Sequence, residues 1–342
     1  MALPETMREF FEKRPELKCV IYAGKGGLGK TTCSAATAYW LAIEKGRKCL
    51  CFSTDPQASL SDIFERDIFG KGVQSFGPGL CVLEIDADKR IAEYQEEIRQ
   101  RIKDMYGLEE IPKEIDEYIK SAAAEPAMHE SATYDAMAEL LASGEYDYYI
   151  FDMPPFGHGI RMVSMAFILD AWIDKITEAR MEAEKYREAI SALRGRVEME
   201  REDMMLKDLM DIKEKLDFFR DILTDEKRSA FFMVIVPEKM AILDTERALD
   251  MFAKLDMKLS GIIVNMVYPV SLLERPDVGP YLRNRIKMQQ KYMDIIWEKF
   301  EPYIRAVLPM YDREPKGLDM IARVAKDLFG WSPEGEVWWR VK

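Results

Sequence analysis

A glycine-rich segment near the start of the chain has residues of the types and spacing that hold phosphate groups. It fits the pattern G-x-x-x-x-G-K-[ST], and with the residue that follows it comprises Gly24, Lys25, Gly26, Gly27, Leu28, Gly29, Lys30, Thr31 and Thr32. Glycines let backbone N–H groups converge on phosphate oxygens, and the N-terminus of a following helix adds a favourable dipole. We expect Lys30 to reach the β- and γ-phosphates of a nucleotide and the Thr31 hydroxyl to bind Mg²⁺.

The elements that would position this loop are short apolar runs that alternate with helical stretches. Runs rich in Val, Ile, Tyr and Phe predict strands over residues 18–23, 48–54, 80–85, 146–152, 230–236, 260–266 and 303–308. Several runs are almost wholly apolar, which is typical of parallel strands covered by helices on both faces. The loop lies between the first strand and a predicted helix over 32–43, which is the context that such a motif requires. We therefore predict an α/β fold with a doubly wound, mostly parallel sheet.

Two long connections between these strands are helical in pattern and rich in Met, Glu and Lys. Apolar residues recur in them at spacings of three and four. These residues are Met162, Met165, Leu169, Trp172 and Ile176 in one stripe and Met205, Leu209, Ile212, Leu216, Phe219 and Leu223 in another. We interpret 88–130 and 161–228 as an inserted helical subdomain. Residues 1–87, 131–160 and 229–342 would form the nucleotide-binding core.

The composition narrows the classes of partner and site. The net charge of −12 argues against nucleic acid as the main partner, because phosphate backbones require a basic face. No basic stretch leads into an apolar run at the N-terminus, and no apolar run approaches the ~20 residues that span a bilayer, so we expect a cytoplasmic protein. We expect the cysteines to be buried, reduced thiols. They are Cys19, Cys33, Cys49, Cys51 and Cys81. The absence of a CxxC pair and the presence of only two histidines predict that there is no zinc site.

Lys25 gives the glycine-rich loop a second lysine, directly after the first glycine. In this respect the loop resembles the deviant P-loops of a group of ATPases in the SIMIBI class of P-loop NTPases. That group includes the arsenite-pump ATPase, the tail-anchored-protein targeting ATPase, the nitrogenase iron protein and the partition and septum-site ATPases. In the group, the second lysine crosses a dimer interface to the partner's nucleotide. The resemblance therefore implies a homodimer with nucleotide held between the subunits.

Three further segments resemble motifs of the arsenite and targeting branch of this group. The run 53–62 (STDPQASLSD) looks like switch I, and the run 150–161 (IFDMPPFGHGIR) looks like switch II. Segments at 237–238, 245–247, 265 and 309–312 follow the order and spacing of the family's base-binding end. The resemblance extends from Lys18 to about Phe329.

The resemblance implies a role for each matching residue. Asp55 would orient or deprotonate the attacking water and help to hold Mg²⁺ through water, and Asp152 would be the Walker B carboxylate, also holding Mg²⁺ mainly through water. The catalytic set would be Asp55, Lys25 and Lys30. Asn265 would recognise adenine, and the other nucleotide-binding candidates beyond the loop are Pro309, Tyr311 and Asp312. The implied activity is hydrolysis of ATP, with ATP and Mg²⁺ as cofactors.

Two departures from the branch leave its biological task open. The targeting ATPases usually carry a zinc-binding CxxC after the Asn-containing strand, whereas the stretch 278–292 has no cysteine. The arsenite ATPases place metalloid-binding cysteines in their helical insertions, whereas this chain has none after Cys81. An arsenite site built from thiolates in that manner cannot form here.

Three functions are consistent with these observations. The first is an ATPase whose dimer closure binds and releases a hydrophobic client helix. Methionine makes up 22 of the 342 residues, and flexible thioethers suit the recognition of varied helices, although the apolar stripes could instead pack on one another. The second is the ATPase subunit of a membrane pump for arsenite-type anions, which the missing cysteines disfavour. The third is a partition- or septum-type ATPase that acts on a surface, which the two large insertions disfavour.

Overall fold

The computed structural model describes residues 3–55, 57–123, 126–154 and 217–334, together with 175, 210, 214, 338 and 339. At its centre is an eight-stranded sheet in the order β3-β4-β2-β5-β1-β6-β7-β8. The strands are β1 (Cys19–Ala23), β2 (Cys49–Ser53), β3 (Gln74–Gly77), β4 (Leu80–Glu84), β5 (Tyr148–Asp152), β6 (Ser229–Ile235), β7 (Gly261–Val267) and β8 (Ile304–Pro309). All neighbouring strands are parallel except β3 and β4, which are antiparallel.

All seven strands predicted from the sequence are present, each within two residues of its predicted bounds. Strand β3 was not predicted. It is short, polar and only partly buried, and it forms the outer edge of the sheet, so it lacks the apolar run that marks the other strands. Most of the confirmed strands are buried on both faces, as in β1 and β6, whereas β4 alternates between buried and partly buried residues.

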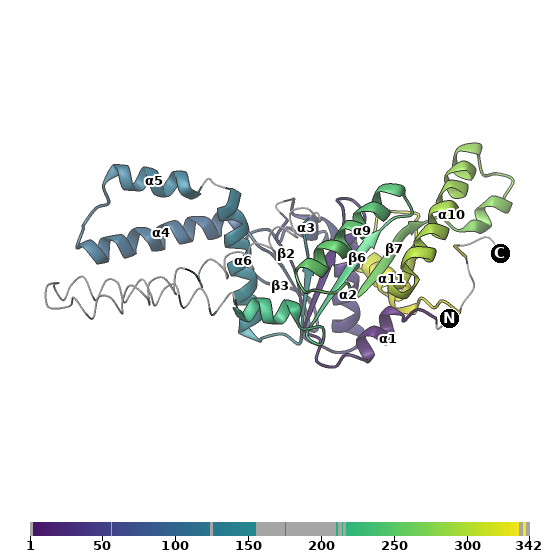
Figure 1. The fold of residues 1–342 in the computed structure, drawn as a ribbon, viewed down its shortest axis with the longest axis horizontal. Coiled ribbons are helices and arrows are strands. Elements are labelled where there is room, and N and C mark those ends of the chain that lie inside the picture. The colour runs from purple at the N-terminus through teal and green to yellow at the C-terminus, as the bar shows by residue number, and fades with distance from the viewer. Residues whose placement is uncertain are drawn as a thin grey trace.

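Helices cover both faces of the sheet, as expected of a doubly wound fold (Figure 1). Helix α2 (Lys30–Tyr39), its continuation η1 (Trp40–Glu44) and the last helix α11 (Gly317–Gly330) pack together on one face. Right-handed crossovers that run the other way along the sheet place α9 (Lys239–Lys254) and α10 (Pro280–Phe300) on the opposite face. The rings of Trp40 and Phe329 stack at 3.8 Å between η1 and α11, which fixes the last helix against the core.

Three helices interrupt the sheet between β4 and β5. They are α4 (Ala87–Tyr106), α5 (Lys113–Ala123) and α6 (Pro126–Ser143). Figure 1 shows α4 and α5 reaching away from the sheet, beyond its β3 edge, as an arm from which α6 returns. Met137 and Leu141 of α6 belong to the same hydrophobic cluster as the sheet, so α6 forms the base of this arm. The domain bounds given above remain a prediction.

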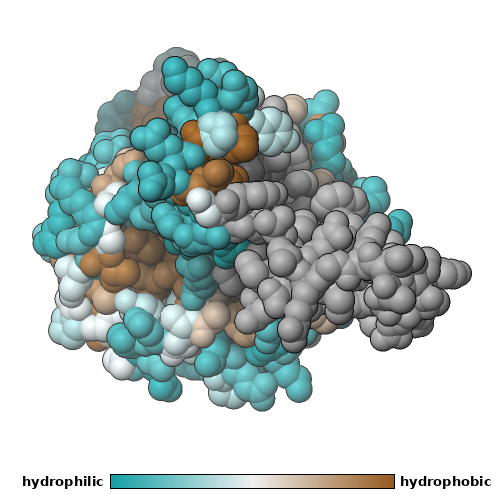
Figure 2. Space-filling model, turned by 90° about the vertical axis from the view of Figure 1, so that its left-hand side faces the viewer, coloured by the Kyte–Doolittle hydropathy of each residue, from teal (hydrophilic) through white to brown (hydrophobic). Residues whose placement is uncertain are grey.

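Most residues of the two apolar stripes lie outside the described part of the chain. The exceptions are Phe219 and Leu223, which are buried in the core cluster, and Phe219 meets Tyr134 of α6 edge-on at 4.6 Å. These two stripe residues therefore pack internally. Figure 2 shows the end of the molecule that bears the arm, where hydrophobic side chains gather in hollows between hydrophilic ones.

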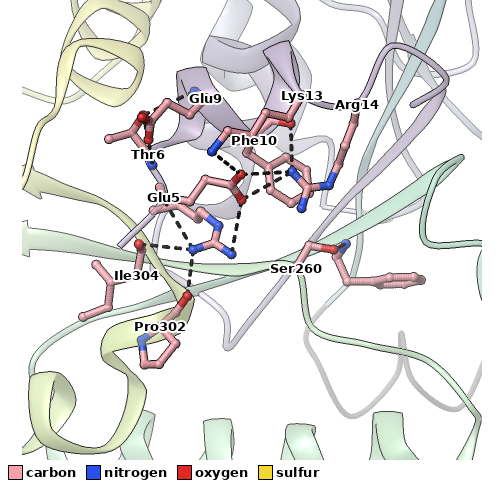
Figure 3. Close-up of polar contacts among 11 residues, drawn as sticks. Glu5, Thr6, Glu9, Phe10, Lys13, Arg14, Ser260, Pro302 and Ile304 are labelled. Carbon is pink, nitrogen blue, oxygen red and sulfur yellow. Dashed lines mark hydrogen bonds and ion pairs between the residues drawn. The ribbon is translucent and has the colours of Figure 1, made fainter. Parts of the chain in front are cut away.

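The two ends of the chain are both tied to the core. Arg305 at the start of β8 is 8% exposed, and its guanidinium contacts the Glu5 carboxylate at 3.7 Å and donates to the Pro302 carbonyl at 2.9 Å (Figure 3). Glu5 precedes helix α1 (Met7–Glu12), which begins with a capping box between Thr6 and Glu9. At the other end, Trp339 stacks on Trp297 of α10 at 4.5 Å.

The cysteines and the described helices fit the remaining structural expectations. Four cysteine side chains are buried, Cys81 is partly buried, and all five are free thiols. Burial raises the pKa of Cys19 to about 12, so this thiol stays protonated at neutral pH. None of the described helices combines the length and the apolar character needed to cross a bilayer.

Candidate functional site

The glycine-rich loop joins β1 to α2 at the carboxyl end of the central strand, in the middle of the sheet. Gly24 has a φ of +148°, and a Cβ there would lie 2.6 Å from the carbonyl oxygen of Val234 on β6. Gly29 has a φ of +95° and immediately precedes α2. Any side chain at either position would strain the backbone or collide with a neighbour, so the tight turn needs glycine at both. Helix α2 begins at Lys30, two residues earlier than predicted.

Lys30 is held within its own loop. Its ammonium donates to the Lys25 carbonyl at 3.1 Å. Burial lowers the pKa of Lys30, and the charges of Asp152 and Asp55 oppose that shift. Lys30 is therefore a buried cation at the N-terminus of a helix, and this position suits it to bind anionic phosphate oxygens. The two nearby carboxylates favour its charged form.

Asp152 ends β5 beside the first turn of α2. Its Oδ2 accepts a hydrogen bond from the Thr31 hydroxyl at 2.7 Å and a longer one from the Ser59 hydroxyl at 3.4 Å. The side chain is 2% exposed, and its Oδ1 has no hydrogen-bond partner among the described residues. Burial raises the pKa of Asp152 to about 6, against the hydrogen bond from Thr31 and the charge of Lys30, which lower it.

These oxygen atoms fit a hard divalent cation. A hydroxyl beside a carboxylate with a free, buried oxygen is the donor set that Mg²⁺ prefers, and Mg²⁺ keeps several water ligands rather than a full protein cage. Within the described residues, no three His, Cys, Asp or Glu side chains come together to form a metal-binding cluster. Thr31 and Asp152 are the residues that would hold the ion, with Asp55 in the turn after the neighbouring strand β2.

Asp55 lies in the turn that follows β2. Its Oδ1 accepts from the backbone N–H of Gln57 at 3.1 Å, and its own N–H donates to the Ser53 hydroxyl at 3.1 Å. The Ser53 hydroxyl in turn donates to the Asp152 carbonyl at 3.3 Å. The turn that carries Asp55 is therefore tied to the end of the strand that carries Asp152.

Lys25 differs from Lys30 in its surroundings. Its side chain is 52% exposed, and the ammonium pairs with Asp244 of α9 at 3.2 Å. Asp244 also contacts Arg247 at 3.5 Å. Within one chain, the second lysine is thus turned toward α9 and is accessible at the surface.

Asn265 lies near the end of β7, where the register with β8 shifts and Met266 has a φ of +58°. Such a bulge redirects side chains at the end of a strand. The Asn265 amide donates to the Leu28 carbonyl at 2.9 Å, so it contacts the glycine-rich loop directly. Its role in recognising adenine remains a prediction.

The other predicted base-end residues lie at the end of β8, where Tyr311 and Asp312 contact α11. The Tyr311 hydroxyl donates to Asp327 at 2.9 Å, and burial raises the pKa of Tyr311. Asp312 pairs with Arg323 at the surface, at 2.9 Å. Pro309 is the last residue of β8. Their contact with a nucleotide also remains a prediction.

A family model described as anion-transporting ATPase matches residues 17–330 of this chain. The chain belongs to this family. A Halobacterium salinarum protein named for an arsenical pump-driving ATPase is 31% identical over 314 residues, which are 91% of this chain and 43% of that protein. The chain thus spans less than half the length of that relative. The ATPase GET3A of Arabidopsis thaliana is 28% identical over 323 residues, 93% of this chain and 86% of the relative. The ATPase ASNA1 homolog of Dictyostelium discoideum is 29% identical over 309 residues, 89% of this chain and 87% of the relative.

Membership of the anion-transporting ATPase family confirms the resemblance inferred from the motifs, and with it the expected ATPase activity. The geometry agrees with this assignment, because the loop, Thr31 and Asp152 come together at the carboxyl edge of a parallel sheet, where nucleotides bind in open α/β folds.

Sequence reasoning missed three residues that the structure places in or around the site of this family member. Ser59 contacts Asp152, Asp244 holds Lys25, and Glu84 is a buried acid at the end of β4. The one signal for Glu84 in the sequence is that it is an acidic residue at the end of an apolar strand, as Asp152 is. Asp244 stands directly before the 245–247 segment, and no periodicity indicates its partner.

Proposed function

We propose that this chain is a Mg²⁺-dependent ATPase that works as a homodimer and uses ATP-driven closure to bind and release a hydrophobic helix. The observation that carries this proposal is the contrast between the two lysines of the glycine-rich loop. Lys30 is buried inside its loop, whereas the Lys25 ammonium lies at the surface. A surface lysine in a phosphate-binding loop is able to reach a nucleotide in a second copy of the chain.

In the proposed reaction, water attacks the γ-phosphorus of ATP, and ADP leaves with the electrons of the broken P–O bond. Asp55, oriented by its turn, positions the water and takes its proton. Lys30 and the backbone N–H groups from Gly24 to Thr32 neutralise charge on the phosphate oxygens. When bound, Mg²⁺ would supply further charge neutralisation, held by Thr31 directly and by Asp55 and Asp152 through water.

The base of the nucleotide would lie toward the ends of β7 and β8. The hydrogen bond from the Asn265 amide to the Leu28 carbonyl of the loop supports a role for Asn265 in binding the base. Pro309 ends β8, and Tyr311 and Asp312 follow within three residues of it. They would line the ribose and adenine.

The hydrophobic client would bind the inserted subdomain, residues 88–130 and 161–228, while the rest of the chain forms the ATPase core. On the described arm, large side chains are exposed on α4 and α5, namely Tyr94, Ile115 and Tyr118, and Tyr118 is 75% exposed. Exposed aromatic and aliphatic groups supply contacts for an apolar helix. The proposal includes a cytoplasmic location and no nucleic-acid partner, consistent with the net charge of −12.

Two alternatives rest on specific observations. Pump driving is favoured by the name of the Halobacterium relative, but all five cysteines of the chain lie in core elements or strands, and four are buried. Thiolates are therefore not available in the arm for an arsenite ion. A partition-type role is weakened by the arm α4–α6 itself, which an ATPase that only dimerises on a surface does not need.

The first experiment tests the ATPase and the dimer. With full-length protein and Mg²⁺, we expect phosphate release from ATP, and a molar mass by light scattering that doubles with ATP but not with ADP. Lys25→Ala should lose turnover, whereas Lys258→Ala, another exposed lysine paired with a carboxylate, should not. When Lys25→Ala is mixed with hydrolysis-deficient Asp55→Asn protein, turnover should exceed the sum of the two separate proteins, because the Asp55→Asn subunit supplies its Lys25 to the site of the other subunit. Rates equal to the sum of the separate proteins would show that Lys25 does not act across an interface.

The second experiment separates the client from the pump. A tail-anchor helix should co-purify with the protein in an ATP-dependent manner, and the same helix with charged residues on its apolar face should not. Arsenite should leave turnover unchanged. Stimulation by arsenite without helix binding would instead support the pump alternative.

A further inference from the structure

Glu84, the last residue of β4, carries a buried carboxylate that no step of the proposed reaction uses. Its side chain is 1% exposed. Oε1 accepts hydrogen bonds from the backbone N–H groups of Leu60 at 2.7 Å and Ser61 at 3.1 Å, and Oε2 accepts one from the Ser61 hydroxyl at 2.5 Å. A buried carboxylate is tolerated only when its oxygens are satisfied in this way.

The three donors all belong to the first turn of α3 (Ser59–Phe64), the short helix that follows the turn carrying Asp55. The residue before this helix is Ala58, which has no side chain able to cap it and has a φ of +50°. Glu84 therefore supplies, from a different strand, the cap that the local sequence lacks. The position of α3 depends on where β4 ends.

On its other side, α3 is attached to the nucleotide site. The Ser59 hydroxyl donates to Asp152 Oδ2 at 3.4 Å, the same oxygen that accepts from Thr31. Across the sheet, Glu84 pairs in register with Ser53, and Ser53 pairs with Asp152. Residues that are level on neighbouring parallel strands project to the same face, so both acids lie on the face where α3 begins.

Glu84 is also close to the arm in sequence. Only Ile85 and Asp86 separate it from α4, and Asp86 caps α4 by accepting from the Lys89 N–H at 3.0 Å. Arg90, one turn into α4, pairs with Asp135 at 3.1 Å and Glu139 at 2.5 Å on α6. The base of the arm is thus joined through two residues to the residue that caps α3.

We infer that Glu84 is a positioning residue that couples the nucleotide site to the base of the helical arm. A displacement of α3 caused by ATP must either break three hydrogen bonds to a buried carboxylate or carry the β4–α4 junction with it. Because an unpaired buried carboxylate is strongly unfavourable, the junction moves. This inference rests on the proposed function, since it supplies the link by which ATP would act on the client subdomain.

The test compares Glu84→Gln with Glu97→Gln, which makes the same chemical change at an exposed position of α4. Glutamine keeps one acceptor oxygen but replaces the other with an amide that cannot accept from Ser61. Hydrogen exchange of full-length protein would be followed at residues 57–64 and 85–92, with and without a non-hydrolysable ATP analogue. In wild-type and Glu97→Gln protein, we expect the analogue to slow exchange in both segments.

In Glu84→Gln protein, we expect slower exchange only at 57–64, with nucleotide affinity within a few-fold of wild type. Turnover should fall about tenfold, as expected when one charge-assisted hydrogen bond is lost from a positioned loop. An unchanged ATP response at 85–92 in this variant would overturn the coupling role. A structural cap alone would change exchange equally with and without the analogue, which would also overturn it.

Two further measurements keep the inference separate from the proposed function and from failure to fold. If wild-type protein hydrolyses ATP and responds at 57–64 but not at 85–92, the coupling is wrong while the ATPase stands. If wild-type protein neither binds nor hydrolyses ATP, the proposed function itself is wrong. Ser61→Ala removes the bond to Oε2, together with the bond that the Ser61 hydroxyl accepts from the Ile68 N–H at 2.9 Å, and keeps both backbone bonds to Oε1. It therefore replaces Glu84→Gln should that variant not fold, with a smaller loss of the response at 85–92 expected.

Discussion

Two buried acids end neighbouring regions of the sheet, and their surroundings differ. Glu84 at the end of β4 has partners on both oxygens, all supplied by α3. Asp152 at the end of β5 has partners on one oxygen, and its other oxygen is buried with no partner in the described part of the chain. A carboxylate satisfied by protein groups holds structure in place, whereas one with a free oxygen is suited to an ion or to water. The comparison separates a positioning acid from a ligand-binding acid on the same face of one sheet.

The largest effect should come from the acids of the ligand-binding side. Asp152→Asn and Asp55→Asn should each lower turnover about 10³-fold, because each removes a negative charge that organises Mg²⁺ and water. Asp55→Asn should still bind ATP. Phosphate release at saturating ATP and Mg²⁺ measures the effect, with Glu97→Gln as the control. If the turnover of Asp152→Asn is no lower than that of Glu84→Gln, the distinction between a ligand-binding acid and a positioning acid is wrong.

The burial of the Asp152 carboxyl predicts how the stability of the protein depends on pH. Because burial raises the pKa of Asp152 to about 6, the folded protein holds this proton more tightly than the unfolded chain, whose pKa is near 3.8. The stabilisation is present below pH 4 and is lost as the pH rises to about 6, by about 3 kcal/mol. Without Mg²⁺, the Tm of Asp152→Asn relative to wild type should therefore increase between pH 4 and 7. Mg²⁺ should reverse part of this difference at pH 7, because a cation favours the carboxylate. A constant difference in Tm across that range would show that the carboxyl is not desolvated.

A buried charge far from the site should affect stability alone. Arg305 pairs with Glu5 at the amino end of β8, and its Nε has no partner among the described residues (Figure 3). Arg305→Ala should lower the free energy of unfolding by about 2 kcal/mol, because it removes a buried side chain and its hydrogen bonds to the Pro302 and Glu5 carbonyls, while the Glu5 carboxylate keeps Lys13 and Arg14 as partners. Turnover at 25 °C should stay within twofold. Urea unfolding measures the first and phosphate release the second. A large loss of turnover in folded protein would show that this end of the sheet also affects catalysis at the nucleotide site.

The smallest effect concerns the surface pair of Lys25 and Asp244. Ion pairs at the surface contribute only about 0.2–1 kcal/mol. Asp244→Asn should therefore weaken the hold on the Lys25 ammonium by up to about fivefold in the equilibrium between its paired and free positions. We expect the ATP concentration that half-saturates dimer formation to fall by a similar factor. Light scattering against ATP concentration gives the value, and Asp256→Asn, at another acid near the end of α9, serves as the control. A rise in that concentration would mean that Asp244 supports the dimer instead of restraining Lys25.

Much of the fold and of the central site could be predicted because it depends on local patterns. Buried strands can be recognised from their apolar runs. The loop from Gly24 to Thr31 can be recognised because a phosphate-binding turn requires glycines, a lysine and a hydroxyl at these positions. The expectation that Asp55 and Asp152 belong to the same site rests on the resemblance of the runs 53–62 and 150–161 to switch I and switch II. Strand β3 was missed because an exposed edge strand carries no such pattern.

The sequence by itself determined the α/β fold of a P-loop ATPase and its family. Only the tertiary structure decided how the remaining polar groups are used. Glu84 caps a helix on another element, Asp244 restrains Lys25, and Arg305 meets Glu5 across the length of the chain. These pairings arise because the sheet brings together segments that are distant in the sequence. A buried charge requires a partner, and the tertiary structure determines which group is close enough to serve.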